Sequence, residues 1–428
     1  MLTGLDRVLR DGLVLPGEGR IGVLCNATTV ASDWTPTADA LAHLRDVRLE
    51  RIFSPQHGFA AEKQDNMIAS ADGVHARLGV PIVSLYGERR EPAPGAFDGL
   101  DALVIDIQDV GTRVYTFLVT ALHILRAAKA HGTPVVVLDR PNPIGGAVEG
   151  PVLEDAFRSF VGIVDVPLRH GLTAAEYCLY GAMRLGLLDE TEAALTAART
   201  RAGVEDEEWL RIVPLEGWKR TYYADDASLP WMMPSPNMPT LDTAIVYPGQ
   251  VVLEATNLSE GRGTTRPFEL FGAPYLDPAK IAGALARGGA PHAAGAAVAG
   301  AGGTAAGSGA LAGALLREVA YEPTFHKFAG ALVRGFQLHV LDRELFRPVY
   351  FTTALLRAVR DAHPAEFTWR EPPYEYEWTR MPADLVYGNA AVREALDAGA
   401  TAEEIARGWD AGVAAYAERV RPLWLYEL

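Results

Sequence analysis

Short apolar runs alternate with longer mixed stretches through the first half of the chain. Runs rich in Val, Ile and Leu, each followed by a polar loop, lie at 20–26, 49–55, 81–87, 102–109 and 134–141. Strands that are buried on both faces read as continuous apolar runs, and such strands are typical of parallel sheets. The pattern therefore predicts a mainly parallel sheet.

The segment 112–132, between the last two runs, has apolar residues at helical spacing and ends in Lys129, His131 and Gly132. A strand, a helix and a second strand in this order are typical of a βαβ unit. We therefore predict a Rossmann-like, doubly wound α/β domain. No G-x-G-x-x-G run follows a strand, so the pattern does not indicate a dinucleotide site.

The second half mixes strands, such as 336–342, with helices, such as 350–363. We place a boundary near Pro248 and predict a catalytic domain at 1–248, followed by a smaller α/β domain at 249–428 that completes the cleft. Residues 288–314 are almost entirely Ala and Gly. Such a segment has too little bulk to pack a core, and we predict a flexible insertion.

The formal charge is −15, from 39 basic and 54 acidic side chains. A negative surface disfavours nucleic acid and anionic membranes as partners. No apolar run approaches the ~20 residues that span a bilayer, and the amino terminus does not resemble a signal peptide, so we expect a cytoplasmic protein. Cys25 and Cys178 are expected to be buried free thiols, and their spacing indicates no zinc site. The oligomeric state cannot be predicted.

Polar side chains recur directly after the predicted strands. Ligands of open parallel sheets bind beyond the carboxyl ends of the strands, where the loops converge. Any one of these residues alone could be a cap or a structural hydrogen bond, but their recurrence at one edge favours a site. The candidates are Gln56, His57, Asp106, Asp109, Arg140 and Asn142, with Glu149 just beyond.

A second concentration of functional groups lies at 254–269, where Glu254, Asn257, Glu260 and Arg262 surround two glycines. Carboxylates and amides bind sugar hydroxyls, and a guanidinium binds a carboxylate in a forked geometry. A charged loop held by its own ion pairs is the alternative. His170, near a predicted helix start, and Asn237, in a stiff proline-rich loop, could be ligand groups or merely capping and turn residues.

Several long motifs occur along the chain in a fixed order: SPQHGF, VSLYG, DIQDVGTRVYTF, VLDRPNPIGG, RHGLT, PSPNMPT and EATNLSEGRGTTRPFE. From about Arg20 to the closing LWLYEL, the chain resembles the NamZ-type exo-β-N-acetylmuramidases. The resemblance implies a Rossmann-like domain, a smaller second domain and a site in the cleft between them. It also implies hydrolysis of terminal, non-reducing N-acetylmuramic acid (MurNAc) in peptidoglycan fragments, without a cofactor. The lactyl carboxylate of this sugar would bind Arg140, Arg262 or Arg113.

Gln56 departs from the pattern of this family, because many members carry Glu at that position. An amide can act neither as a general acid nor as a carboxylate nucleophile, so the acids must come from elsewhere. Most glycosidases use two carboxyl groups, although a substrate with an N-acetyl group can supply its own nucleophile. The candidate acids are Glu254, Glu260, Glu149, Asp109 and Asp106.

Three hypotheses remain open. The first is a glycosidase of cell-wall recycling that acts on imported fragments. The second is a non-catalytic sugar-binding or muropeptide-binding homologue, in which Gln56 marks a lost acid. The third is a hydrolase that uses Asp106, Asp109 and a divalent metal. Two carboxyl groups that converge on one pocket would distinguish the first from the second.

Overall fold

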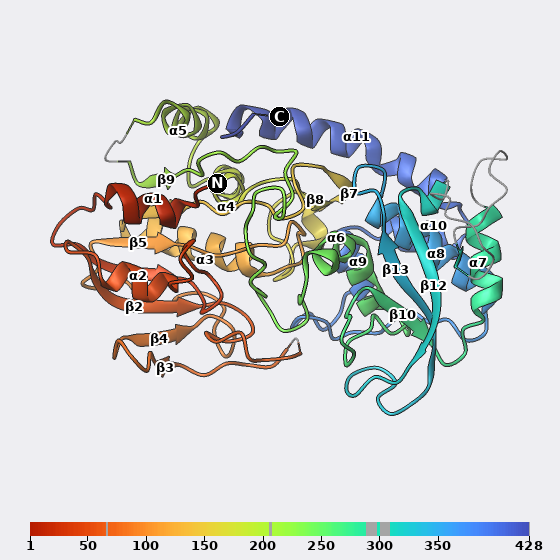
Figure 1. The fold of residues 1–428 in the computed structure, drawn as a ribbon. Coiled ribbons are helices and arrows are strands. Elements are labelled where there is room, and N and C mark those ends of the chain that lie inside the picture. Colours follow the sequence, from red (N-terminus) through yellow and green to blue (C-terminus); the bar gives the residue numbers. More distant parts are fainter. Residues whose placement is uncertain (66, 205–207, 288–297, 300–308, 428) are drawn as a thin grey trace.

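The computed structural model describes residues 1–65, 67–204, 208–287, 298–299 and 309–427 (Figure 1). Two sheets lie at opposite sides of the molecule, and loops, helices and short strands lie between them. The predicted insertion at 288–314 falls mainly outside the described residues. Of its described part, Val298–Ala299 form a short strand, Gly309–Leu311 form a short 3-10 helix and Ala314 begins a further strand.

The larger sheet has seven strands in the order β3-β4-β2-β1-β5-β6-β9, and every pair except β3–β4 is parallel. This confirms the predicted mainly parallel sheet. The apolar runs predict five of the strands, although each strand ends earlier than its run. The bounds are β1 (Arg20–Leu24), β2 (Arg48–Ser54), β3 (Gly73–Val74), β4 (Pro81–Ser84), β5 (Ala102–Ile105), β6 (Val135–Leu138) and β9 (Leu210–Val213).

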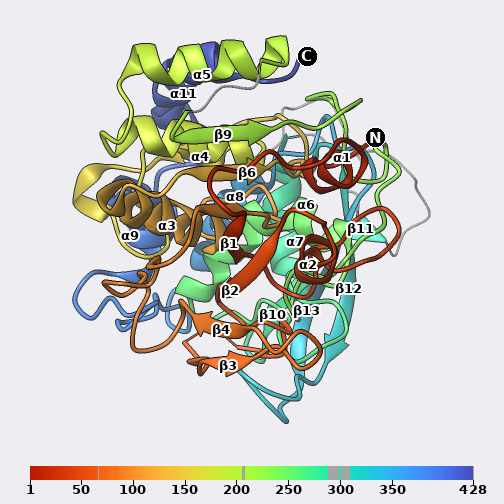
Figure 2. The ribbon, with the colours of Figure 1, turned by 90° about the vertical axis from the view of Figure 1, so that its left-hand side faces the viewer.

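Helices cover both faces of this sheet, as the doubly wound prediction requires (Figure 2). Leu103 and Ile105 of β5 pack in the same cluster as side chains of α3 (Phe117–His131) and α4 (Ala174–Arg184). The alternate residues Ala102 and Val104 pack with side chains of the helices on the other face, α1 (Gly4–Asp11) and α2 (Thr37–Ala42). Successive side chains of a strand point to opposite faces, so β5 is buried on both.

The second half of the chain forms a smaller α/β unit around a four-stranded sheet in the order β10-β13-β12-β11. Helix α6 (Leu241–Gln250) packs against α8 (Pro348–Ala362) beside this sheet, and Pro248, our predicted boundary, lies inside α6. A Cβ at Gly249 would lie 1.9 Å from the carbonyl oxygen of Pro348, so only glycine permits this approach. The strands are β10 (Leu270–Ala273), β11 (Val298–Ala299), β12 (Ala314–Tyr321) and β13 (Val333–Val340), and further helices are α7 (Pro278–Arg287), α9 (Pro382–Tyr387) and α10 (Ala391–Asp397).

The last helix, α11 (Ala402–Val420), carries the chain back to the first domain, along the same side of the molecule as α5 (Glu190–Ala202) (Figures 1 and 2). It contacts β7 (Glu149–Val152), which pairs with β8 (Pro167–Arg169). No described helix combines the length and the apolar character needed to cross a bilayer.

The tail after α11 is bound by polar contacts in the core of the first domain. The Tyr426 hydroxyl donates to Asp139 Oδ2 at 2.5 Å and accepts from the Leu215 amide at 2.8 Å. The Leu425 amide donates to Glu176 Oε1 at 2.8 Å. Burial raises the pKa of Asp139 to about 7, against the lowering effect of its donors. The tail therefore adds hydrogen bonds to three buried groups of the first domain, Asp139, Glu176 and the Leu215 amide.

We predict that Tyr426→Phe lowers the free energy of unfolding by about 1–3 kcal/mol, because it leaves the buried Leu215 amide without its partner and removes one of the hydrogen bonds to the Asp139 carboxyl. Urea denaturation measures the change. Tyr222→Phe, at a half-buried tyrosine of the same apolar cluster, is the matched control and should change the midpoint little. Equal stability of Tyr426→Phe and wild type would show that the tail is not a stabilising contact.

Candidate active site

A pocket of about 430 Å³ lies between the two halves of the molecule and takes side chains from both. Gln56 and His57 come from the loop after β2, and Thr116 comes from the amino-terminal end of α3. Glu254 and Arg262 come from the segment after α6, which we predicted from its composition. Tyr374 and Glu375 come from a loop between α8 and α9.

Gln56 is held in one orientation by three partners. Its Oε1 accepts a hydrogen bond from the Thr116 hydroxyl at 2.5 Å. Its Nε2 therefore faces the other way and donates to the Tyr86 hydroxyl at 2.9 Å and to Glu375 Oε1 at 3.4 Å. The amide thus acts as a donor towards a carboxyl group of the second half.

His57 also lines the pocket, in a left-handed backbone conformation with φ 73°. Its Nδ1 lies 2.7 Å from the carbonyl oxygen of Lys63, so Nδ1 carries the proton and Nε2 is left as an acceptor. Burial lowers the pKa of His57 to about 4, so the ring is neutral near pH 7. Asn237 lines the same pocket, and its amide donates to the carbonyl of Gln64.

Arg262 lies at the centre of a buried group of charges. Its Nη2 donates to Glu254 Oε1 at 2.7 Å, and its Nε lies 3.5 Å from Glu260 Oε1. Glu254 Oε2 also accepts from the Tyr374 hydroxyl at 2.9 Å. Among the described residues, Arg262 Nη1 has no hydrogen-bond partner, although it is buried. The pocket therefore has an unused guanidinium N–H group.

Glu260 is turned away from this pocket and towards two further basic residues. Lys327 Nζ lies 2.9 Å from its Oε2, and His326 Nδ1 lies 3.1 Å from its Oε1. Burial alone would raise the pKa of Glu260, but Lys327, His326 and Arg262 hold it well below its usual range. Asn257 lies outside the pocket as well, because its side chain binds the chain around Glu366 and the Tyr275 hydroxyl.

Glu375 is the carboxyl group that the sequence analysis missed. Burial raises its pKa to about 7, although the Tyr86 hydroxyl donates to Oε2 at 2.7 Å and lowers it; nearby Glu254 raises it further. The segment EPPYEYEW (371–378) places acids between aromatic residues after two prolines. The same reasoning that selected the stiff loop of Asn237 would have indicated this loop.

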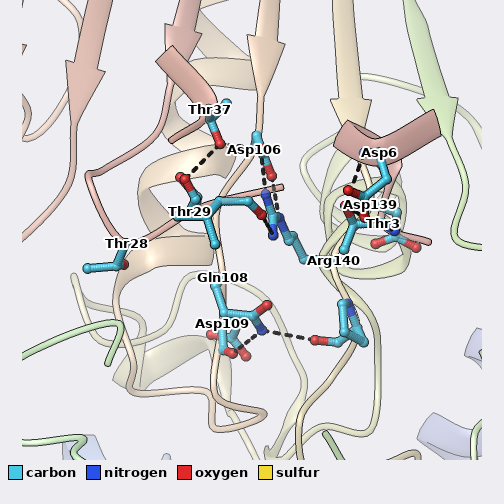
Figure 3. A network of polar contacts seen from close by, with 12 residues as sticks. Thr3, Asp6, Thr28, Thr29, Thr37, Asp106, Gln108, Asp109, Asp139 and Arg140 are labelled. Carbon is cyan, nitrogen blue, oxygen red and sulfur yellow. Dashed lines mark hydrogen bonds and ion pairs between the residues drawn. The ribbon is translucent and has the colours of Figure 1, made fainter. Parts of the chain in front are cut away.

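The predicted strand-end residues Asp106 and Arg140 bind each other (Figure 3). Arg140 donates from Nε and Nη2 to the two carboxylate oxygens, at 2.6 and 2.8 Å, and from Nη1 to the Val30 carbonyl at 2.8 Å. The Thr37 hydroxyl donates to Asp106 Oδ2 at 2.6 Å. Arg140 borders a second cavity, of about 570 Å³, but its guanidinium is occupied by these contacts.

The other predicted residues at this edge also bind the protein itself. Asp109 Oδ2 lies 3.0 Å from His170 Nε2 and accepts from the Gly111 amide at 2.6 Å. Gln108, which lies between the two predicted aspartates, donates to the Pro141 carbonyl (Figure 3). Among the residues that the structure describes, no three His, Cys, Asp or Glu side chains are grouped so that they could hold a metal ion.

Three further candidates are placed away from the pocket. Arg113 is fully buried and donates to the carbonyls of Pro151, Val166 and Val386. Asn142 donates to the Leu172 carbonyl at 3.1 Å. Glu149 accepts from the Tyr350 amide at 2.8 Å, and burial raises its pKa. Of all the predicted residues, the structure brings together Gln56, His57, Asn237, Glu254 and Arg262 at the pocket.

Comparisons with known proteins find matches along almost the whole chain. The family model described as exo-beta-N-acetylmuramidase NamZ, N-terminal, matches residues 21–242, and the corresponding C-terminal model matches 245–426. A Bacillus subtilis (strain 168) protein, peptidoglycan beta-N-acetylmuramidase NamZ, is 34% identical over 411 residues, which are 95% of this chain and 87% of the relative.

Solved structures of similar fold also cover the full length. A DUF1343 family protein from Bacteroides fragilis NCTC 9343 superposes with a TM-score of 0.78 at 26% identity, over 99% of this chain and 98% of that one. A second DUF1343 family protein from the same organism gives 0.68 at 23% identity, over 100% and 99% of the two chains. At that identity the second likeness concerns the fold alone.

We predict that Arg140→Met lowers the free energy of unfolding by about 3–5 kcal/mol, because it leaves the Asp106 carboxylate buried without its partner. The double variant Asp106→Asn/Arg140→Met should recover part of this loss, since no unpaired charge remains. Urea denaturation measures both. A stable Arg140→Met protein that had lost sugar binding would instead identify Arg140 as a ligand residue.

Proposed function

The chain belongs to the exo-β-N-acetylmuramidase NamZ family, and we propose that it is a glycosidase that releases terminal, non-reducing, β-linked MurNAc from peptidoglycan fragments. The observation that carries this proposal is the pocket between the two halves, which combines two carboxyl groups with an arginine that has an unused N–H group. Most glycosidases use two carboxyl groups at the scissile bond, so the convergence of two on one pocket favours hydrolysis over binding alone.

Arg262 supports the choice of sugar. MurNAc differs from N-acetylglucosamine by a lactyl ether that ends in a carboxylate. A guanidinium binds a carboxylate by short, charge-assisted hydrogen bonds, which are strongest where water is excluded. Arg262 lines the pocket, and its buried Nη1 has no partner among the described residues, which supports Arg262 as the group that takes a carboxylate oxygen of the substrate.

Glu254 supports the chemistry. Its carboxylate receives hydrogen bonds from Arg262 and from the Tyr374 hydroxyl, which fix its position. A fixed negative group beside the sugar stabilises the positive charge that develops at C1 as the glycosidic bond breaks. The N-acetyl group of the substrate offers a second route, because its carbonyl oxygen can attack C1. Either route requires a separate proton donor for the leaving oxygen.

We also propose that the enzyme works in the cytoplasm, in the recycling of wall fragments that the cell has taken up. Both cysteines are free and buried, as the sequence predicted. This fits a reducing compartment, where disulfides are rare. Cell fractionation with immunodetection should find the protein with cytoplasmic markers, and recovery from the culture medium would contradict this location.

The function can be tested with a chromogenic β-MurNAc glycoside beside its β-N-acetylglucosamine analogue. We expect hydrolysis of the MurNAc glycoside in the presence of a chelator. Arg262→Met should lower the ratio of kcat/KM between the two sugars about 10- to 100-fold, since a hydrogen bond to a charged group contributes about 1.5–3 kcal/mol.

The ratio matters because Arg262 also supports Glu254, and loss of that support reduces hydrolysis of both sugars alike. Arg266→Met is the matched control, since this arginine of the same segment is largely exposed and pairs with Glu269. An unchanged ratio in Arg262→Met would show that Arg262 does not bind the lactyl group. Activity that disappeared with the chelator would favour the metal-dependent hypothesis.

A further inference from the structure

We propose that Glu375 donates the proton to the leaving oxygen, and that Tyr86 and Gln56 position its carboxyl group; this rests on the proposed glycosidase function. Two observations support the assignment: the donors that bind the Glu375 carboxyl group, and the backbone turn that carries this residue. It assigns the role of general acid to a loop of the second half, and not to the predicted residues at the strand ends.

The direction of each hydrogen bond around Tyr86 is determined. Its hydroxyl oxygen accepts from the Met67 amide at 2.9 Å and from Gln56 Nε2 at 2.9 Å. With both acceptor positions taken, the hydroxyl proton must be donated to Glu375 Oε2, which lies at 2.7 Å. Oε2 is therefore always an acceptor.

The other oxygen of Glu375 is free to carry a proton. Within the described part of the chain, its one hydrogen bond is the long contact of 3.4 Å from Gln56 Nε2. Glu375 lines the pocket. Only 5% of the surface of this residue is exposed, so no bulk water competes for the acid proton. Burial raises the pKa to about 7, which leaves a large protonated fraction at neutral pH. A general acid is most effective with a pKa near the working pH.

The backbone that carries Glu375 is a strained turn. The amide and carbonyl groups of Tyr374 and Glu377 are paired with each other at 2.9 Å. The two residues between them, Glu375 and Tyr376, have φ values of 45° and 65°. Two positive φ angles in a two-residue connection are typical of a type I′ turn, where Asn and Gly are favoured because other residues are strained.

Side-chain contacts on all sides of the turn offset this strain. The Tyr374 hydroxyl is bound to Glu254, and the Tyr376 ring packs against Tyr86 with 5.7 Å between centroids. The Arg90 guanidinium lies over the Tyr376 ring, 3.6 Å from its centroid. Strained residues that the surroundings hold in place are concentrated at functional sites.

The two carboxyl groups of the pocket thus have different environments. Glu254 is bound by a guanidinium and a hydroxyl, an arrangement that suits a carboxylate, whereas the hydrogen-bond donors that the structure describes at the buried Glu375 are neutral. Pairs of acids whose surroundings differ in this way divide the roles of charged group and proton donor.

The proposed step conserves atoms and charge. The proton on Glu375 Oε1 passes to the glycosidic oxygen while the bond from that oxygen to C1 breaks and leaves its electron pair on the oxygen. The leaving alcohol departs. Water then adds to C1 and returns a proton to the Glu375 carboxylate, so that the products are MurNAc and the shortened fragment.

The identity of residue 56 also follows from this arrangement. Gln56 presents an N–H group to Glu375, whereas a glutamate in the same orientation would place a second carboxyl group 3.4 Å from the first. Two carboxyl groups that close cannot both be charged. An amide at position 56 is therefore compatible with the acid Glu375 on the facing loop, and Gln56 is a positioning residue.

The decisive experiment compares leaving groups in the intact Glu375→Gln protein. Hydrolysis of a MurNAc disaccharide, whose leaving alcohol needs protonation, should fall about 10²–10⁴-fold. Hydrolysis of a dinitrophenyl β-MurNAc glycoside, whose leaving group departs without a proton, should fall at least tenfold less. A residue with a purely structural role would reduce both alike, and that result overturns the proposal.

Two variants keep the comparison sound. Glu371→Gln changes an exposed acid of the same loop and should leave both rates unchanged. Glu375→Gln keeps the shape of the side chain, and an unaltered urea midpoint at pH 6 would show that it folds. If wild type hydrolyses neither substrate, the proposed function fails and this assignment with it. If wild type is active and Glu375→Gln retains disaccharide activity, only the assignment fails.

The pH profile gives an independent test. Activity needs the protonated acid, so kcat/KM of wild type should fall as pH rises through about 7, and this basic limb should be absent in Glu375→Gln. The Tyr86 hydroxyl stabilises the charged form and lowers the pKa of Glu375; among the neighbouring charges, Glu254 raises this pKa and Arg262 lowers it. Tyr86→Phe should therefore move the limb to higher pH. A limb that stayed in place in both variants would assign it to another group.

Discussion

The pocket depends on a buried group of charges that neutralise one another. Arg262 lies between Glu254 and Glu260, and Lys327 binds Glu260 from the other side. Two acids and two bases balance, so none of them remains a single charge in a medium of low dielectric constant. This balance fixes Glu254, and Glu254 binds the Tyr374 hydroxyl. Tyr374 is the first residue of the β-turn that places Glu375 beside Gln56 and Tyr86. A short series of buried contacts therefore connects the pocket residues of the first half with those of the second.

The sequence predicted the architecture well because its signal is local. Five apolar runs marked five of the strands of the large sheet, and a helix-periodic segment with a glycine at its end marked α3. The strand β9 was missed, since its neighbours in the sequence lie in a helix-rich stretch and its burial comes from packing beside β6. Whether a short apolar segment joins a sheet is decided by contacts distant in sequence.

The site was only partly predictable, for a related reason. Asp106, Asp109, Arg140 and His170 lie at the edge of the sheet where ligands bind, but they bind one another in pairs. Sequence shows which groups reach that edge and does not show which of them satisfy each other there. Glu375 is 319 positions from Gln56, and no periodicity connects them. The contact between Glu375 and Gln56 forms because the second half of the chain folds against the first, and no local sequence pattern predicts this packing.

The tail that follows α11 has a consequence for how the molecule is made. Leu425 and Tyr426 supply hydrogen bonds to Glu176, Asp139 and Leu215, all within the half of the chain that is synthesised first. On the ribosome, the large sheet can assemble while these groups still lack the hydrogen bonds of the tail, for the time in which some 200 further residues are added. Domains generally fold as units in the order of synthesis. Here the first unit reaches its final stability only after the tail that follows α11 has been synthesised, so the two halves complete their folding together.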